Sequence, residues 1–206
     1  MTLSTTPEKL NKVLEIIANN LSNNKIPFAI IGAMALGLYG LPRFTSDLDL
    51  ITEGRFWPDL QPIMERLGYT CYQKTDTFAQ FESELGVMGY IDFLFTDTPD
   101  GSAILERRVV IEDELLGGKY PVVQPTDYII LKMMAVANSP GRSLKDEADI
   151  EAFVQLYRNR MVPNYFEPLD MERIYLFADR FGQRKLIEKY IDRLQLDEGM
   201  KGPFEL

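Results

Sequence analysis

The sequence predicts an α+β fold, with a small mixed β-sheet and flanking helices over residues 1–124 and a helical region over residues 125–206. In the first part, short apolar or alternating runs bounded by Gly and Pro are typical of strands, and they alternate with helix-like spacing. From Pro125 onward only helical spacing recurs, and loops containing Pro or Gly interrupt it. A hydrophobic content of 46% is enough to fill a core.

The expected elements follow from apolar spacing and from helix-stop or turn residues. A Thr-Pro-Glu start followed by Leu10, Leu14, Ile17 and Leu21 predicts the first helix. We expect strands at residues 26–32, 46–52, 69–74, 78–83 and 90–96, and a hairpin within residues 107–124 whose turn lies near Gly117-Gly118. We expect helices at residues 5–25, 33–40, 55–68, 125–138, 143–159, 170–182 and 183–195.

Two residue counts exclude several classes of catalytic site. The chain has one cysteine, Cys71, and no histidine. It therefore forms no disulfide within the chain and no cysteine-rich zinc site, and it has no histidine general base or Ser-His-Asp triad. Catalysis would have to depend on carboxylates, Lys, Arg, hydroxyl groups or a metal held by oxygen ligands. We expect Cys71 to be a buried strand residue.

Charge and hydropathy limit the partners. The net charge of −9 gives no strong signature of sequence-independent nucleic-acid binding, which depends on Lys and Arg at phosphates. The N-terminus has no basic segment followed by an apolar one, and the longest apolar run, "YIILKMMAVA", is too short to span a bilayer. We expect a cytoplasmic protein without a membrane partner.

Aspartates within predicted strands are the main functional signal. In "SDLDLIT", Asp47 and Asp49 project from the same face because strand side chains alternate. Asp92 lies in the apolar run "YIDFLF". If the two strands are neighbours, three carboxylates converge, which is the ligand set for a two-ion Mg²⁺ site (or Mn²⁺ as an alternative). The competing interpretation is a solvated strand edge in an interaction domain; Asp92 argues against it because its flanks are apolar.

The stretches "IIGAMALGLYG", "PRFTSDLDL" and "YIDFLF" together resemble the nucleotidyltransferase superfamily of the DNA polymerase β type, in particular its compact bacterial members such as the AbiEii-like toxins. The resemblance covers roughly residues 27–155. It implies that Gly32 and Ala33 form the phosphate-binding turn and that Asp47, Asp49 and Asp92 hold the metals. The turn is Gly-Ala here, where the family usually has Gly-Gly or Gly-Ser.

Further site candidates lie on either side of these motifs. Lys132 is either a lysine that reaches solvent from an apolar helix or, as the resemblance implies, a point charge on the triphosphate. Asp149 either pairs with Lys145 at i,i+4 spacing or, as the resemblance implies, positions or deprotonates the acceptor; Asp146 is the weaker candidate for that second role. Arg43 is a candidate phosphate or acceptor contact; the alternative is an ordinary exposed loop arginine.

The function that these features predict is Mg²⁺-dependent nucleotidyl transfer by a nucleotide-binding protein, with ATP as one expected nucleotide. A nucleotidyl group moves from an NTP to a hydroxyl-bearing acceptor, pyrophosphate leaves, and the helical region completes the nucleotide cleft. The acceptor is a small molecule, a tRNA end or a protein side chain. The alternative is a catalytically weak relative that binds nucleotide or a protein partner as a toxin–antitoxin-like regulatory module, which the Gly-Ala turn slightly favours.

Overall fold

The computed structural model describes residues 7–42, 44–83, 88–113, 118–139, 141 and 143–196. The chain divides into two compact units. The first comprises the residues up to Leu38 together with Pro42–Gln124, and the second comprises Tyr39–Leu41 and the residues from Pro125 onward. Strands occur only in the first unit among the described residues, and the described part of the second is helical. The α+β class expected from the sequence is therefore observed.

A mixed sheet forms the centre of the first unit. Its seven described strands are β1 (Phe28–Ile30), β2 (Asp47–Thr52), β3 (Tyr69–Lys74), β4 (Phe78–Ser83), β5 (Tyr90–Phe95), β6 (Val109–Asp113) and β7 (Gly118–Val122). Their order across the sheet is β3-β4-β5-β2-β1-β7-β6. The pairs β2–β5 and β1–β7 are parallel, and the other neighbours are antiparallel. The chain therefore crosses over between β2 and β5, and between β1 and β7.

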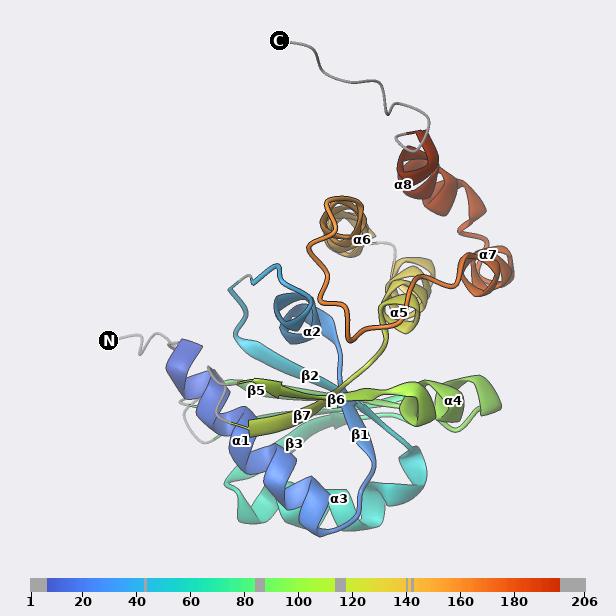
Figure 1. Ribbon diagram of the computed structural model, residues 1–206. Coiled ribbons are helices and arrows are strands. Elements are labelled where there is room, and N and C mark those ends of the chain that lie inside the picture. The colour runs from blue at the N-terminus through green and yellow to red at the C-terminus, as the bar shows by residue number, and fades with distance from the viewer. Residues whose placement is uncertain are drawn as a thin grey trace. The chain divides into compact units, whose positions relative to one another are not determined.

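Helices cover both faces of this sheet (Figure 1). On one face lie α1 (Pro7–Asn23) and α3 (Trp57–Arg66), which follows a short 3₁₀ turn, η1 (Gly54–Phe56). On the other face lies α2 (Gly32–Leu38). The predicted apolar stripe of α1 is buried: Leu14 and Leu21 have no exposed surface. Burial of each such side chain stabilises the fold by about 1.5–3 kcal/mol.

The structure differs from the sequence-based expectation in two places and confirms it in a third. Helix α4 (Pro99–Arg107) was not predicted, although Thr98 caps it by accepting a hydrogen bond from Gly101 N at 3.1 Å. Cys71 is only half-buried, so the expectation of a buried residue is wrong. The β6–β7 hairpin is confirmed by its antiparallel register, and its turn lies outside the described residues.

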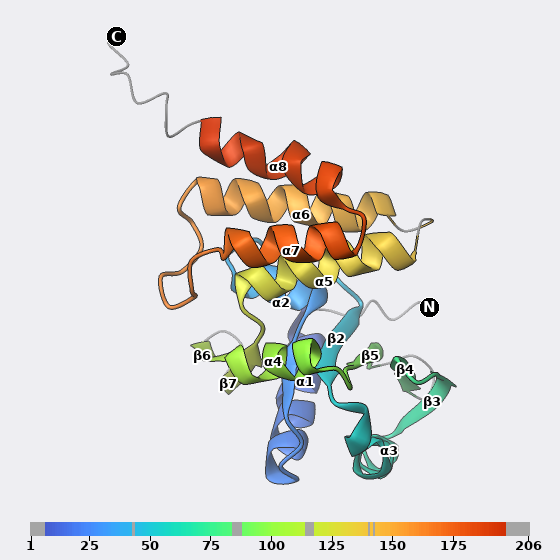
Figure 2. The same ribbon diagram turned by 90° about the vertical axis from the view of Figure 1, so that its right-hand side faces the viewer.

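The second unit packs four described helices around an aromatic core: α5 (Pro125–Asn138), α6 (Ser143–Arg158), α7 (Met171–Arg180) and α8 (Arg184–Leu196). Figure 2 shows their axes side by side. The ring of Tyr39 meets those of Tyr128, Phe153 and Phe166 edge-on, at centroid distances of 5.4, 5.3 and 4.8 Å. Burial raises the pKa of Tyr39 well above its ordinary value. None of the described helices has the length and hydropathy needed to cross a bilayer.

Candidate active site

Strands β2 and β5 bring the three predicted aspartates to one face of the sheet. Their parallel register pairs Asp49 with Asp92 and Asp47 with Tyr90. Leu48 and Leu50 point to the opposite face and are fully buried, whereas the three aspartates are half-buried. The strand adjacency on which the carboxylate hypothesis depended is therefore present. Asp49 and Asp92 stand side by side, and Asp47 is one strand repeat from Asp49.

Hydrogen bonds from polar neighbours orient two of these carboxylates. Ser46 Oγ donates to Asp47 Oδ1 at 2.6 Å. On the other side, Gln80 Nε2 of β4 donates to Asp92 Oδ2 at 3.0 Å, and these two residues are register partners. The sequence analysis did not identify Ser46 or Gln80. Alternation in "FAQFES" was the available signal for Gln80, because it places this side chain on one face of its strand.

Gly32 sits directly against Asp49 at the start of α2. Its φ is +64°, in the left-handed region that favours glycine. A Cβ at this position would lie 2.0 Å from Asp49 Oδ2 and 2.7 Å from its Cγ. The backbone also joins the two segments, because Ile31 N donates to Asp49 O at 3.0 Å. Both the conformation and the space therefore require glycine here.

Ala33 follows Gly32 in the first turn of α2, and its side chain is buried. The backbone of these two residues is the predicted phosphate turn, and the structure places that turn beside the Asp49 carboxylate. Arg43, the other loop candidate, lies outside the described residues. Its assignment to a phosphate or acceptor contact stays a prediction.

Two exposed tyrosines stand on the edge of this negatively charged face. Tyr72 and Tyr90 are 47% and 41% exposed, and their rings meet edge-on with centroids 6.3 Å apart. The pKa of Tyr72 is raised, first by partial burial and then by the negative charge of Asp92, with Tyr90, Glu82 and Asp47 adding to the shift. The sequence analysis did not connect Tyr72 with the site, because strand β4 lies between β3 and the strand of Asp92. It also did not single out Tyr90, which is two residues before Asp92 on β5.

The carboxylates suit a hard cation, but they do not form a closed metal centre in this structure. Among the described residues, no three acidic or thiol side chains converge as a group that could hold a metal ion. The donor chemistry nonetheless fits Mg²⁺, because all three side chains offer oxygen. In addition, the absence of a Cβ at Gly32 leaves space for the Asp49 carboxylate at the start of α2, which a larger residue would fill.

Lys132 and Asp149, both predicted site residues, contact each other within the second unit. Lys132 Nζ lies 2.6 Å from Asp149 Oδ2 and 2.8 Å from Asp146 Oδ1. The side chain of Lys132 is 11% exposed, so the interpretation of a lysine reaching solvent is wrong. This cation holds two buried carboxylates of α6 against α5. The assignments of Lys132 to phosphate and of Asp149 to the acceptor stay predictions.

Comparison with solved structures identifies the fold. The antibiotic-resistance factor ANT(2'')-Ia superposes with a TM-score of 0.59 at 14% identity, covering 91% of this chain and 99% of its own. A second structure of ANT(2'')-Ia, in complex with adenylyl-2''-tobramycin, superposes with a TM-score of 0.58 at 16% identity, covering 85% of this chain and 98% of its own. An antigenic nucleotidyltransferase-like protein from Paracoccidioides brasiliensis superposes with a TM-score of 0.53 at 14% sequence identity, covering 91% of this chain and 94% of its own. By sequence, no family model and no curated protein matches the chain. At these identities the likeness shows a nucleotidyltransferase fold.

Proposed function

We propose that the protein is a Mg²⁺-dependent nucleotidyltransferase that moves a nucleotidyl group from an NTP to a hydroxyl-bearing acceptor. The observation that carries the proposal is the juxtaposition of Asp49 and Asp92 on neighbouring parallel strands, with Asp47 on the same face and Gly32 against Asp49. This is the placement that divalent-metal phosphoryl-transfer chemistry needs. The nucleotidyltransferase fold is consistent with it.

In the proposed reaction, the acceptor oxygen forms a bond to the α-phosphorus while the bond to the pyrophosphate oxygen breaks. The acceptor hydroxyl would give its proton to the Asp92 carboxylate, and pyrophosphate would leave. Asp47, Asp49 and Asp92 would hold Mg²⁺, which when bound neutralises phosphate charge and favours the ionised acceptor oxygen. Asp92 would also accept a hydrogen bond from the acceptor hydroxyl. The Gln80 amide keeps the Asp92 carboxylate oriented for that contact.

Phosphate binding is assigned to the backbone at Gly32 and Ala33. Amide groups in the first turn of a helix lack acceptors within the helix and carry partial positive charge, so they favour a phosphate oxygen. Because Ala33 offers no hydroxyl, the turn can contribute only main-chain donors. We propose that Lys132 supplies phosphate charge in addition, in which case its ion pairs with Asp146 and Asp149 would have to loosen when nucleotide binds.

A binding module without turnover is the second candidate function. Two observations favour it: the described carboxylates do not converge into a three-ligand group, and the phosphate turn is Gly-Ala. Such a protein would bind NTP without cleaving it. The two candidates therefore differ in whether bound NTP is cleaved between its α- and β-phosphates or stays intact.

The test follows α-³²P-labelled NTP with Mg²⁺ in the presence of water alone, tobramycin, total tRNA or a protein extract. Nucleotidyl transfer predicts NMP or a labelled acceptor together with pyrophosphate. Asp92→Asn should lose nearly all of this turnover and remain folded, whereas Asp59→Asn, an exposed change of the same charge on α3, should keep it. Bound but intact NTP would support the binding module. Release of NDP and phosphate would contradict the proposed reaction.

A further inference from the structure

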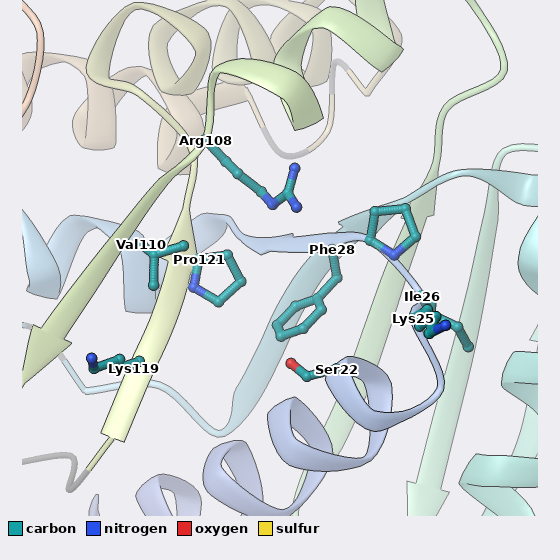
Figure 3. Close-up of a pocket in the computed structure, with 9 residues that line it drawn as sticks. Ser22, Lys25, Ile26, Phe28, Arg108, Val110, Lys119 and Pro121 are labelled. Carbon is teal, nitrogen blue, oxygen red and sulfur yellow. The ribbon is translucent and has the colours of Figure 1, made fainter.

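A basic pocket lies at the edge of the first unit where β1 begins (Figure 3). Its volume is about 360 Å³, and its described lining comes from the end of α1, the start of β1, and the β6–β7 ribbon. Among the described residues, β1 and β7 are paired in register only at Ile30 and Val122. The two strands therefore separate toward the start of β1, and the pocket occupies the gap.

Three cations line this pocket, and no acidic side chain is among its described lining residues. The cations are Lys25 after α1, Arg108 after α4, and Lys119 on β7. The exposed Lys119 approaches one carboxylate outside the lining, Glu112 Oε2, at 3.7 Å. The guanidinium of Arg108 donates a hydrogen bond to Leu105 O, which holds it beside the end of α4. In a chain of net charge −9, three cations around one hollow make a local positive field that attracts anions.

The backbone of Lys25 is in a conformation that favours glycine. Its φ is +57°, at the end of a helix closed by hydrogen bonds from Ile26 N to Leu21 O and from Lys25 N to Ser22 O, both 3.0 Å. This is the position where helices usually have glycine. The lysine is therefore unfavourable for the backbone, and its side chain supplies a cation to the pocket.

Apolar surface accompanies the charges. Ile26, Pro27, Phe28, Val110 and Pro121 complete the lining apart from Ser22, which adds a hydroxyl group. Val110 is 59% exposed, so its apolar surface is available to a ligand. A site with a few polar groups on an apolar wall is typical of small-molecule binding.

We propose that this pocket binds a small organic anion, namely a phosphate ester or a carboxylate attached to a compact apolar body. The anionic group faces Arg108, with Lys25 and Lys119 on opposite sides of the pocket adding to the positive field (Figure 3), and the apolar body rests on Val110 and Pro121. This binding does not depend on the proposed transferase activity, since none of these residues belongs to the carboxylate site.

The test is a ¹H–¹⁵N NMR titration of the full chain, in EDTA so that divalent ions make no contribution. The probes are phenyl phosphate, benzoate and the uncharged phenol. We expect an anionic probe to shift the amide signals of Lys25, Arg108 and Lys119, and phenol to bind at least about tenfold more weakly, because the charged contacts are missing. Whether the phosphate, the carboxylate or both bind identifies the anionic group.

Lys25→Gly separates the ligand role from the fold. Because glycine suits this φ, the variant should unfold at the same or a higher denaturant concentration than the wild type. It should nevertheless bind the anion about tenfold more weakly. Lys12→Gln, the same charge change on the exposed part of α1, should leave affinity unchanged. The proposal is overturned if neither anion binds, if phenol binds equally well, or if Lys25→Gly has wild-type affinity or Lys12→Gln loses as much.

Discussion

Substitution of Gly32 by alanine tests the local geometry of the candidate site. The added Cβ would lie 2.0 Å from Asp49 Oδ2, 2.7 Å from its Cγ and 2.9 Å from its Cβ, so the carboxylate would have to move. An L-residue at φ +64° costs about 1–2 kcal/mol, and forcing atoms into filled space costs about 1–3 kcal/mol. We expect Gly32→Ala to lower the free energy of unfolding by roughly 2–5 kcal/mol.

Gly37→Ala is the matched control because it lies in the same helix. Its Cβ would meet only Pro42 Cα, at 3.7 Å, an ordinary contact. Alanine there should stabilise the helix by up to about 1 kcal/mol. Urea unfolding followed by circular dichroism compares the two variants. Equal effects at the two positions, or wild-type stability in Gly32→Ala, would refute the close approach of Gly32 to Asp49.

Three further predictions concern the rest of the fold. Lys132→Gln removes the cation that contacts the buried Asp146 and Asp149 carboxylates and should cost about 3–5 kcal/mol in thermal unfolding; a raised KM for NTP at unchanged stability would instead favour the phosphate role. Burial raises the pKa of Tyr69 to about 12 in the folded state, above its ordinary value of 10.0. Stability should therefore be complete below pH 10 and fall as the pH rises toward 12, and Tyr69→Phe should reduce that slope in urea titrations. Thr98→Ala should destabilise the fold by about 1 kcal/mol through loss of the cap of α4, whereas Thr98→Ser should not; equal losses would exclude a role for the hydroxyl.

Alternation and turn residues were sufficient to predict much of the sheet. In "SDLDLIT", period-2 spacing assigned Leu48 and Leu50 to one face of the strand and Asp47 and Asp49 to the other, and the structure agrees. Helix α4 escaped notice because its apolar residues are few, although Thr98-Pro99 is a helix-start signal. Cys71 was misjudged because residue type alone predicts burial poorly in β3, a strand at the edge of the sheet.

Contacts between distant segments could not be read from local patterns. The approach of Gly32 to Asp49 depends on how β1 and β2 pair, and the Gln80–Asp92 bond depends on the order of β4 and β5. For Asp149, local helix spacing suggested Lys145 as its partner. The packing of α5 on α6 instead brings Lys132 to it, since a cation buried there needs a partner.

The most direct test of the central claim is calorimetric titration of each NTP, with and without Mg²⁺, into the wild type, Asp49→Asn and Asp59→Asn. Binding should require Mg²⁺, disappear in Asp49→Asn and persist in Asp59→Asn, because only the former carboxylate stands beside Asp92 and Gly32. Absence of binding by the folded wild type, or equal Mg²⁺-dependent binding by Asp49→Asn, would contradict the assignment of this face as the nucleotide and metal site.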